Sequence, residues 1–123
     1  MIQGKFIDGD KAVVPANIAW GPVAQTQYFV LDTGFTGDLI VTPEIAEDLG
    51  LEITNMTSAH LVAGEIINLP TATALALMEG EQLYVSVVIA KGWPLLGMSF
   101  LEKFNYKAIV DCYKKTVTLE VSK

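Results

Sequence analysis

Short apolar runs separated by turn-forming residues dominate the chain. The run over residues 116–121 alternates polar and apolar side chains, as expected for a strand that is buried on one face. The other runs are also of strand length, and turn residues such as Gly and Pro separate several of them. Many short strands in one chain predict a small barrel or sandwich. We predict strands over residues 2–7, 12–20, 25–31, 39–41, 56–62, 66–78, 82–90, 106–112 and 116–121.

The first two runs have the form of a hairpin. Asp8-Gly9 separates them and suits a hairpin turn, because both residues tolerate positive φ angles. Pro15 lies inside the second run, where proline removes a backbone donor. We therefore expect an edge strand or a bulge at Pro15.

Two segments carry helix signals. Thr42 is a suitable N-cap, Pro43 fits the first helical position, and Gly50 suits the left-handed position that ends a helix. These residues predict a short helix from Pro43 to Gly50. Residues 99–102, Ser-Phe-Leu-Glu, have the form of a capping box. They predict a second short helix with Ser99 as its N-cap.

Length and hydropathy limit the organisation of the chain. A length of 123 residues predicts a single domain over residues 1–123. Hydrophobic residues make up 51% of the chain and the mean hydropathy is +0.41, near the high end for a soluble domain. Either most strands are buried on both faces, or a partner subunit covers part of the apolar surface. No apolar run reaches the roughly 20 residues of a membrane-spanning helix, so we expect no membrane partner.

The charge and cysteine content narrow the function classes. The chain has 8 basic and 14 acidic residues, and its net charge of −6 disfavours a nucleic-acid partner. Cys112 is the only cysteine, which excludes an intrachain disulfide and fits a reducing compartment. The N-terminal segment has no apolar core of signal-peptide length, so we expect a cytoplasmic protein.

One carboxylate stands in an unusual place. Asp32-Thr33-Gly34 directly follows the apolar run 28–31, and a charge there is unfavourable unless it has a purpose. Gly34 lets the backbone turn sharply, and the Thr33 hydroxyl can tie down its surroundings. The combination suggests a carboxylate held rigidly at a bend for chemistry. Taken alone, the motif also fits an ordinary turn.

A second element strengthens the chemical interpretation. Leu95-Leu96-Gly97 lies farther along the chain and runs directly into the second predicted helix. With both elements in this order, the chain resembles the retropepsin-like aspartic peptidases, and most closely their small single-domain bacterial relatives. The resemblance covers nearly the whole chain. It includes the N-terminal hairpin, the segment 31–37, the helix at 43–50, a hairpin around Val62-Ala63-Gly64, and the ending 110–119.

The resemblance implies an all-β fold, a closed barrel of the acid-protease type with one or two short helices. It also implies one catalytic Asp per chain. Two carboxylates are needed for this hydrolysis, and the motif occurs once, so two chains would pair as a homodimer with their Asp32 residues meeting across a two-fold axis. The substrate would be a peptide or protein, and we expect neither a cofactor nor a metal.

The resemblance also assigns roles. Asp32 would be the general base in one subunit and the general acid in the other, and Thr33 would lock the two loops together across the axis. Gly34 would let the backbone approach the carboxylate and the substrate. The loop would rest on Leu95, Leu96 and Gly97. Val62, Ala63 and Gly64 would form the tip of a flap that closes over substrate.

The leading hypothesis is therefore a homodimeric aspartic endopeptidase. The alternative is a catalytically inactive dimer of the same fold that binds peptides or mediates assembly, because fold does not entail activity. The terminal segments 1–6 and 116–123 are expected as interface strands by resemblance, although the alternation at the C-terminus fits an ordinary barrel strand equally well.

Several other residues receive simpler interpretations. Phe35 adds bulk beside Asp32, where it restricts substrate or fills the core. Asp38 is expected to be solvated in the loop after the motif. His60 is expected on the surface of a flap strand, and Cys112 is expected to pack in the core or at an edge rather than act as a nucleophile.

Overall fold

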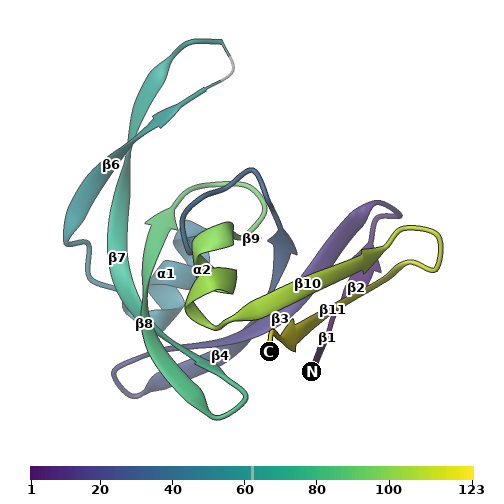
Figure 1. Ribbon diagram of the computed structural model, residues 1–123. Helices are drawn as coiled ribbons and strands as arrows, with labels where there is room; N and C mark the ends of the chain where they lie inside the picture. Colours follow the sequence, from purple (N-terminus) through teal and green to yellow (C-terminus); the bar gives the residue numbers. More distant parts are fainter. Residues whose placement is uncertain (62) are drawn as a thin grey trace.

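The computed structural model describes residues 1–61 and 63–123. Strands make up most of it, and the two helices are short (Figure 1). No helix in this described part is long and apolar enough to cross a membrane. The elements in chain order are β1 (Ile2–Gln3), β2 (Lys5–Ile7), β3 (Lys11–Trp20), β4 (Val23–Leu31), β5 (Leu39–Val41), α1 (Pro43–Leu49), β6 (Asn55–His60), β7 (Ile66–Met78), β8 (Glu81–Ile89), β9 (Leu95–Leu96), α2 (Met98–Lys103), β10 (Tyr106–Asp111) and β11 (Thr116–Val121).

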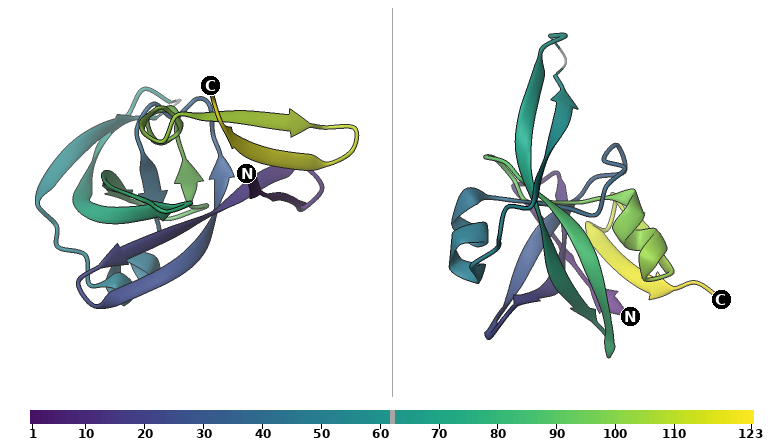
Figure 2. Two further views of the ribbon diagram at one scale, coloured as in Figure 1. Left: turned by 60° about the horizontal axis from the view of Figure 1, so that its bottom comes forward. Right: turned by 90° about the vertical axis from the view of Figure 1, so that its left-hand side faces the viewer.

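The larger sheet closes on itself. Its strands follow the order β2-β3-β4-β9-β5-β8-β7-β6, and a further pairing between β3 and β7 completes the ring. Closure removes the free edges that the central strands would otherwise have. The predicted all-β barrel with two short helices is thus confirmed. Figure 2 shows α1 and α2 on opposite sides of this barrel.

The barrel interior is filled by side chains from every strand of the ring. Phe29, Ile18 and Leu39 are among the largest that are fully buried, and Phe100 of α2 is buried with them. Fully burying each such side chain stabilises the fold by about 1.5–3 kcal/mol relative to leaving it exposed. This core fixes the ends of β4, β5 and β9, the three strands that surround Asp32-Thr33-Gly34.

The N-terminal run predicted over 2–7 forms two strands in two different sheets. Gly4 separates β1 from β2, and its N–H donates to the Val117 carbonyl at 2.8 Å. A Cβ at Gly4 would overlap the Val13 carbonyl oxygen, so glycine allows the backbone to pass this close. As a result β1 pairs with β11, while β2 forms the predicted hairpin with β3.

The prediction of an edge strand at Pro15 was wrong for β3 as a whole, but β3 is paired on only one side at Pro15 itself. Strand β3 is a central strand, and Pro15 is paired with Tyr28 of β4. On the other side, β3 pairs with β2 through residues 11–13 and with β7 through residues 17–19. Pro15 lies between these two ladders, where a missing donor leaves no ladder hydrogen bond unmade.

Helix α1 begins and ends as predicted. The Thr42 side chain accepts a hydrogen bond from the Ile45 N–H at 3.2 Å, and Pro43 opens the helix. Gly50 follows in the left-handed conformation, with φ of 71°. The Leu51 N–H then donates to the Ala46 carbonyl at 3.0 Å. Local sequence signals alone account for both ends of this helix.

Strands β6 and β7 form a long hairpin that projects from the barrel (Figures 1 and 2). Their last described pair is His60 with Ile66, and the Leu61 N–H donates to the Glu65 carbonyl at 2.8 Å. This hairpin is where the flap was predicted. Its side chains are largely exposed, including His60 as expected, so packing against the barrel does not hold its outer half in place.

Candidate active site

The loop between β4 and β5 carries Asp32, and β9 holds both of its ends. Strand β9 runs parallel to β4 and antiparallel to β5, so Leu96 is the partner of both Leu31 and Leu39. The Asp32 N–H donates to the Leu96 carbonyl at 3.0 Å. The structure therefore brings together the two elements that the sequence singled out, Asp32-Thr33-Gly34 and Leu95-Leu96-Gly97.

The Asp32 carboxylate is held by its own loop. Its Oδ1 atom accepts a hydrogen bond from the Gly34 N–H at 2.9 Å, and the Asp32 carbonyl accepts from the Phe35 N–H at 3.2 Å. The residue is half-buried, and none of the ion pairs among the described residues involves it. The carboxylate is thus oriented but not neutralised by a cation, as a group that exchanges protons requires.

Helix α2 starts against this loop. Its first residue, Met98, donates its N–H to the Phe35 carbonyl at 2.8 Å, and the Ser99 N–H donates to the Gly37 carbonyl at 3.2 Å. The predicted capping box at Ser99 was wrong, because the helix begins at Met98 with Gly97 as its N-cap and no side-chain cap. The first N–H groups of the helix thus donate to backbone carbonyls of the loop, and no capping side chain is needed as their acceptor.

Phe35 covers two glycines. Its half-buried ring lies so close to Gly37 that a Cβ there would be 2.6 Å from the Cζ atom. A Cβ at Gly97 would be 2.6 Å from Cδ2 of the same ring. The ring therefore packs against the base of the loop, which favours the core-filling interpretation of Phe35.

Asp38, which was expected to be solvated, is buried with 3% of its surface exposed. Its Oδ2 atom accepts hydrogen bonds from the Ser86 N–H at 2.8 Å and from Lys103 Nζ at 2.5 Å. Its carbonyl accepts from the Gly97 N–H at 2.9 Å. Asp38 thus joins the end of the loop to β8 and to both ends of α2. No local sequence pattern points to the Asp38–Lys103 pair, because its members lie 65 residues apart.

Replacing Lys103 with methionine is expected to destabilise the protein by about 2–4 kcal/mol, because it leaves the Asp38 carboxylate buried without a cation. Chemical denaturation measures this change. The matched control is Lys11→Met, which removes an ion pair with Asp10 whose carboxylate side chain is 78% exposed and should cost less than about 1 kcal/mol. Equal losses in the two variants would contradict a structural role for Lys103.

The flap tip is described in part. Val62 lies outside the described residues and Ala63 is exposed. Gly64 has a φ of 85°, and a Cβ placed on it would have none of the described neighbours within 4 Å. A hollow of about 1040 Å³ lies between α1 and the flap hairpin. Apolar side chains make up most of its lining, among them Leu51, Ile67 and Leu69.

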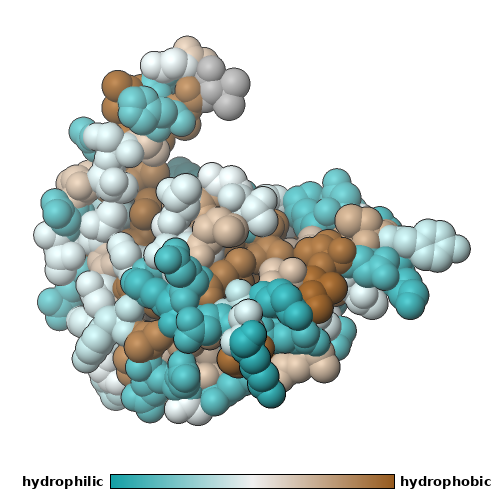
Figure 3. All heavy atoms as spheres, in the orientation of Figure 1, coloured by the Kyte–Doolittle hydropathy of each residue, from teal (hydrophilic) through white to brown (hydrophobic). Residues whose placement is uncertain are grey.

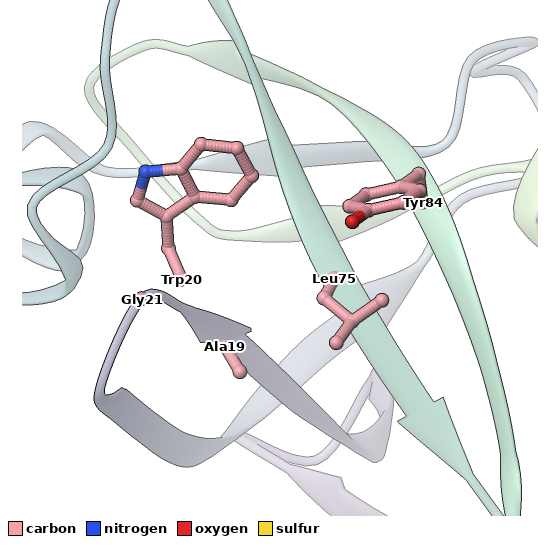
Figure 4. Close-up of a pocket in the computed structure, with 5 residues that line it drawn as sticks. All are labelled: Ala19, Trp20, Gly21, Leu75 and Tyr84. Atoms are coloured by element: carbon pink, nitrogen blue, oxygen red, sulfur yellow. The ribbon is translucent and has the colours of Figure 1, made fainter.

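A second hollow, of about 370 Å³, lies at the tip of the β3–β4 hairpin. Figure 4 shows the Trp20 and Tyr84 rings on either side of it, with Leu75 below them. Its described lining consists of Ala19, Trp20, Gly21, Leu75 and Tyr84, none of which carries a carboxylate, thiol or imidazole.

Outside the loop, the described residues hold few features of a reactive site. No group of three His, Cys, Asp or Glu side chains among them could hold a metal ion. Cys112 is exposed in the turn after β10, contrary to the expected packing role.

Two groups away from the Asp32 loop, Tyr106 and Glu79, have shifted pKa values. Burial, and then a hydrogen bond to Glu79, raise the pKa of the Tyr106 phenol. Hydrogen bonds from the N-terminal ammonium and from Tyr106 lower the pKa of Glu79.

Comparison with solved structures shows a clear likeness of fold. No protein-family model and no curated protein sequence matches the chain. Among solved structures, it is similar to a retropepsin-like aspartic protease from Rickettsia conorii, with 24% sequence identity and a TM-score of 0.60. The match covers 97% of this chain and 87% of that one. The chain therefore has the fold of the retropepsin-like aspartic proteases.

Proposed function

We propose that the protein is an aspartic endopeptidase that hydrolyses peptide bonds as a homodimer. The observation that carries the proposal is the Asp32 carboxylate, which is oriented by the Gly34 N–H in a loop anchored to β9. A half-buried carboxylate that is held in place, and that forms no ion pair with any described residue, is suited to proton transfer. The likeness to a retropepsin-like protease supports the same class of chemistry.

Each chain contributes half of the site. Peptide hydrolysis by this route needs one carboxylate to remove a proton from water and a second, protonated one to donate to the substrate carbonyl. Two adjacent carboxylates repel each other when both are charged, so the pair retains one proton. Because Asp32-Thr33-Gly34 occurs once per chain, the second Asp32 comes from another copy around a two-fold axis.

The chemical steps follow from this arrangement. One Asp32 takes a proton from the water as the water oxygen bonds to the carbonyl carbon, and the other Asp32 donates its proton to the carbonyl oxygen. The C–N bond of the resulting tetrahedral intermediate then breaks as one Asp32 gives its proton to the amine nitrogen and the other takes a proton from a hydroxyl of the intermediate, so the pair again holds one proton. Gly34 keeps space open beside the carboxylate, since a Cβ there would be 3.3 Å from Oδ1.

Thr33 and the flap complete the proposed site. Thr33 is exposed beside Asp32, where its hydroxyl is available to bond the loop of the other subunit. The flap tip at Val62-Ala63-Gly64 closes over a bound peptide, so that its backbone bonds the substrate and excludes water. We also propose a cytoplasmic location, because the exposed thiol of Cys112 suits a reducing compartment.

A Gly64→Ala variant tests the flap. Alanine is strained at a φ of 85°, so the tip should change conformation and kcat/KM should fall about 5–20-fold with little effect on the melting temperature. The control is Gly9→Ala, which places the same strain at φ of 77° in the hairpin between β2 and β3. An unchanged kcat/KM in Gly64→Ala, or an equal loss in Gly9→Ala, would remove the flap from the proposal.

The proposal as a whole is tested with a peptide library incubated with purified protein between acidic and neutral pH, and analysed by mass spectrometry. We expect cleavage by the wild-type chain and none by Asp32→Asn. Cleavage by both proteins, or by neither, would count against the mechanism. In the second case, a dimer that binds peptides without cleaving them would support the inactive alternative.

A further inference from the structure

The hollow at the tip of the β3–β4 hairpin lies far from the Asp32 loop. Trp20 ends β3 and Asp32 follows β4, so the nine residues of β4 separate the two, a span of about 30 Å at about 3.3 Å per residue. In Figure 3, hydrophobic surface extends along β10 and the adjoining end of α2, which Figure 1 shows away from this tip. A ligand in the hollow would therefore leave the surface beside the Asp32 loop open.

The hollow is built on a row of cross-strand neighbours. Ala19 of β3 pairs with Leu75 of β7, and Leu75 pairs with Tyr84 of β8, so the three side chains lie on the same face of the sheet. Trp20 follows Ala19, and its indole lies on the opposite side of the hollow from the Tyr84 ring (Figure 4). Because Ala19 is small, a space of about 370 Å³ remains between the larger side chains, within the range of about 300–1,000 Å³ found for ligand pockets.

Both aromatic rings of the hollow are uncovered. Tyr84 is 68% exposed, and Trp20 is half-buried. Among the described residues, no other ring stacks on either of them and no lysine lies over their faces. The ring faces are therefore free to contact a ligand.

The polar side-chain groups of the lining are the indole N–H of Trp20 and the phenol O–H of Tyr84. An indole N–H can only donate a hydrogen bond, whereas a phenol O–H can donate or accept. Neither group has a hydrogen-bond partner among the described residues, and neither is buried without one. The five described lining residues carry no charge. The matching ligand is uncharged, supplies acceptors, and has apolar faces for the two rings.

We propose that this hollow, the Trp20–Tyr84 site, binds a proline-rich segment of another protein in the polyproline II conformation. A proline ring supplies an uncharged apolar face for an aromatic ring. Proline has no N–H, and a polyproline II helix has no internal hydrogen bonds, so its carbonyl oxygens are free to accept from Trp20 and Tyr84. Such a segment is extended before it binds, so it loses little conformational entropy. The inference does not depend on the proposed peptidase activity.

Two other ligand classes match the lining less well. A sugar presents hydroxyl groups that both donate and accept, but the Tyr84 oxygen is the one acceptor among the described lining side chains. A quaternary ammonium group binds ring faces through its positive charge, but no described lining residue supplies a carboxylate to balance that charge. Both classes enter the test as competing ligands.

A decaproline peptide with blocked ends tests the site. In Trp93→Phe, Trp20 is the only tryptophan, so its fluorescence reports on the hollow directly. We expect decaproline to change this emission saturably. A blocked Gly-Ser repeat of the same length, which is uncharged but flexible, should not change it. Maltohexaose and tetramethylammonium chloride should also leave it unchanged. Isothermal titration calorimetry then gives the dissociation constant of decaproline for the wild-type chain.

Two replacements at Tyr84 separate ring contact from hydrogen bonding. Tyr84→Ala removes the ring and should raise the dissociation constant at least about tenfold, as at an interface hot spot. Tyr84→Phe keeps the ring and should raise it about 2–10-fold, the effect of one lost hydrogen bond. The control is Tyr113→Ala, which removes a tyrosine that is 95% exposed in the turn after β10 and should change it less than about twofold. Circular dichroism should show an unchanged fold, because both tyrosines are largely exposed.

The outcomes separate this inference from the proposed function. Wild-type affinity in Tyr84→Ala or Tyr84→Phe, or an equal loss in Tyr113→Ala, would overturn the proline site. Saturable binding of maltohexaose or tetramethylammonium at Trp20 in place of decaproline would also overturn it. Asp32→Asn should bind decaproline as tightly as the wild-type chain, whether or not the protein is a peptidase. Binding that is lost in Asp32→Asn would place the peptide at the Asp32 loop and overturn the inference.

Discussion

Replacing Asp32 with asparagine is expected to lower kcat/KM for peptide hydrolysis by about 10²–10⁴-fold, the range of general acid–base catalysis. Asparagine is nearly isosteric, and its side-chain oxygen can still accept the hydrogen bond from the Gly34 N–H. The loop should therefore keep its conformation. The amide can neither take a proton from water nor hold the shared proton, so only the chemistry is removed.

The measurement compares Asp32→Asn with a matched variant. Asp48→Asn makes the same replacement at an exposed position on α1, and should leave kcat/KM within about twofold of wild type. Thermal unfolding and ultracentrifugation should show that both variants fold and dimerise like the wild-type chain. A loss of activity that is confined to Asp32→Asn then reports on its carboxylate and not on stability.

Mixing the two chains tests whether the site is shared. If each active site needs two Asp32 carboxylates, a mixed dimer is inactive. With total protein constant and subunits exchanging freely, activity should then fall with the square of the wild-type fraction. A linear dependence on that fraction would mean that one carboxylate per site is sufficient, and would contradict the shared pair.

Features of this fold such as helix ends could be predicted from the sequence, because the interactions that determine them join residues only a few positions apart. Thr42, Pro43 and Gly50 determine α1 through contacts inside the helix and its caps. The loop at Asp32 could be located because a charge followed by glycine interrupts an apolar run. Its junction with Leu96 was anticipated from the resemblance, since the pattern of the two segments alone does not show that they touch.

The features that depend on tertiary contacts could not be predicted in this way. The residues from Ser99 onward have the form of a capping box, yet the first N–H groups of α2 donate to the carbonyls of Phe35 and Gly37 instead. From the sequence, Asp38 looks like a solvated loop residue. In the structure it is buried, and hydrogen bonds from Lys103 and from the Ser86 N–H stabilise its carboxylate there. In each case the missing information was which distant backbone or side chain would be adjacent.

Gly97→Ala is expected to be the most destabilising single-methyl change at the site, at about 3 kcal/mol or more. A Cβ at this position would overlap the Gly37 carbonyl oxygen and lie 2.6 Å from the Phe35 carbonyl oxygen. Both atoms belong to the backbone of the loop that carries Asp32, and both carbonyls accept hydrogen bonds from the first turn of α2. Neither can move away without breaking those bonds.

The expected consequence is a coupled loss of stability and activity. A loss of 3 kcal/mol would lower the melting temperature by on the order of 10 °C for a domain of this size. Where the variant remains folded, the displaced loop should carry Asp32 out of position, and displacements of about 1 Å can reduce turnover about 100-fold. Calorimetry and peptidase assays below the melting transition measure the two effects separately.

Two variants isolate the cause of the Gly97→Ala effect. Gly9→Ala adds the same methyl group where nothing lies within 4 Å, so its loss should be limited to the roughly 1 kcal/mol of an unfavourable positive φ. In Gly97→Ala/Phe35→Ala the ring is absent, but the two carbonyl oxygens remain. If the carbonyls cause the strain, this double variant should be no more stable than Gly97→Ala. Recovery of wild-type stability would instead assign the strain to the Phe35 ring. It would mean that a methyl group at position 97 does not displace the loop backbone that carries Asp32.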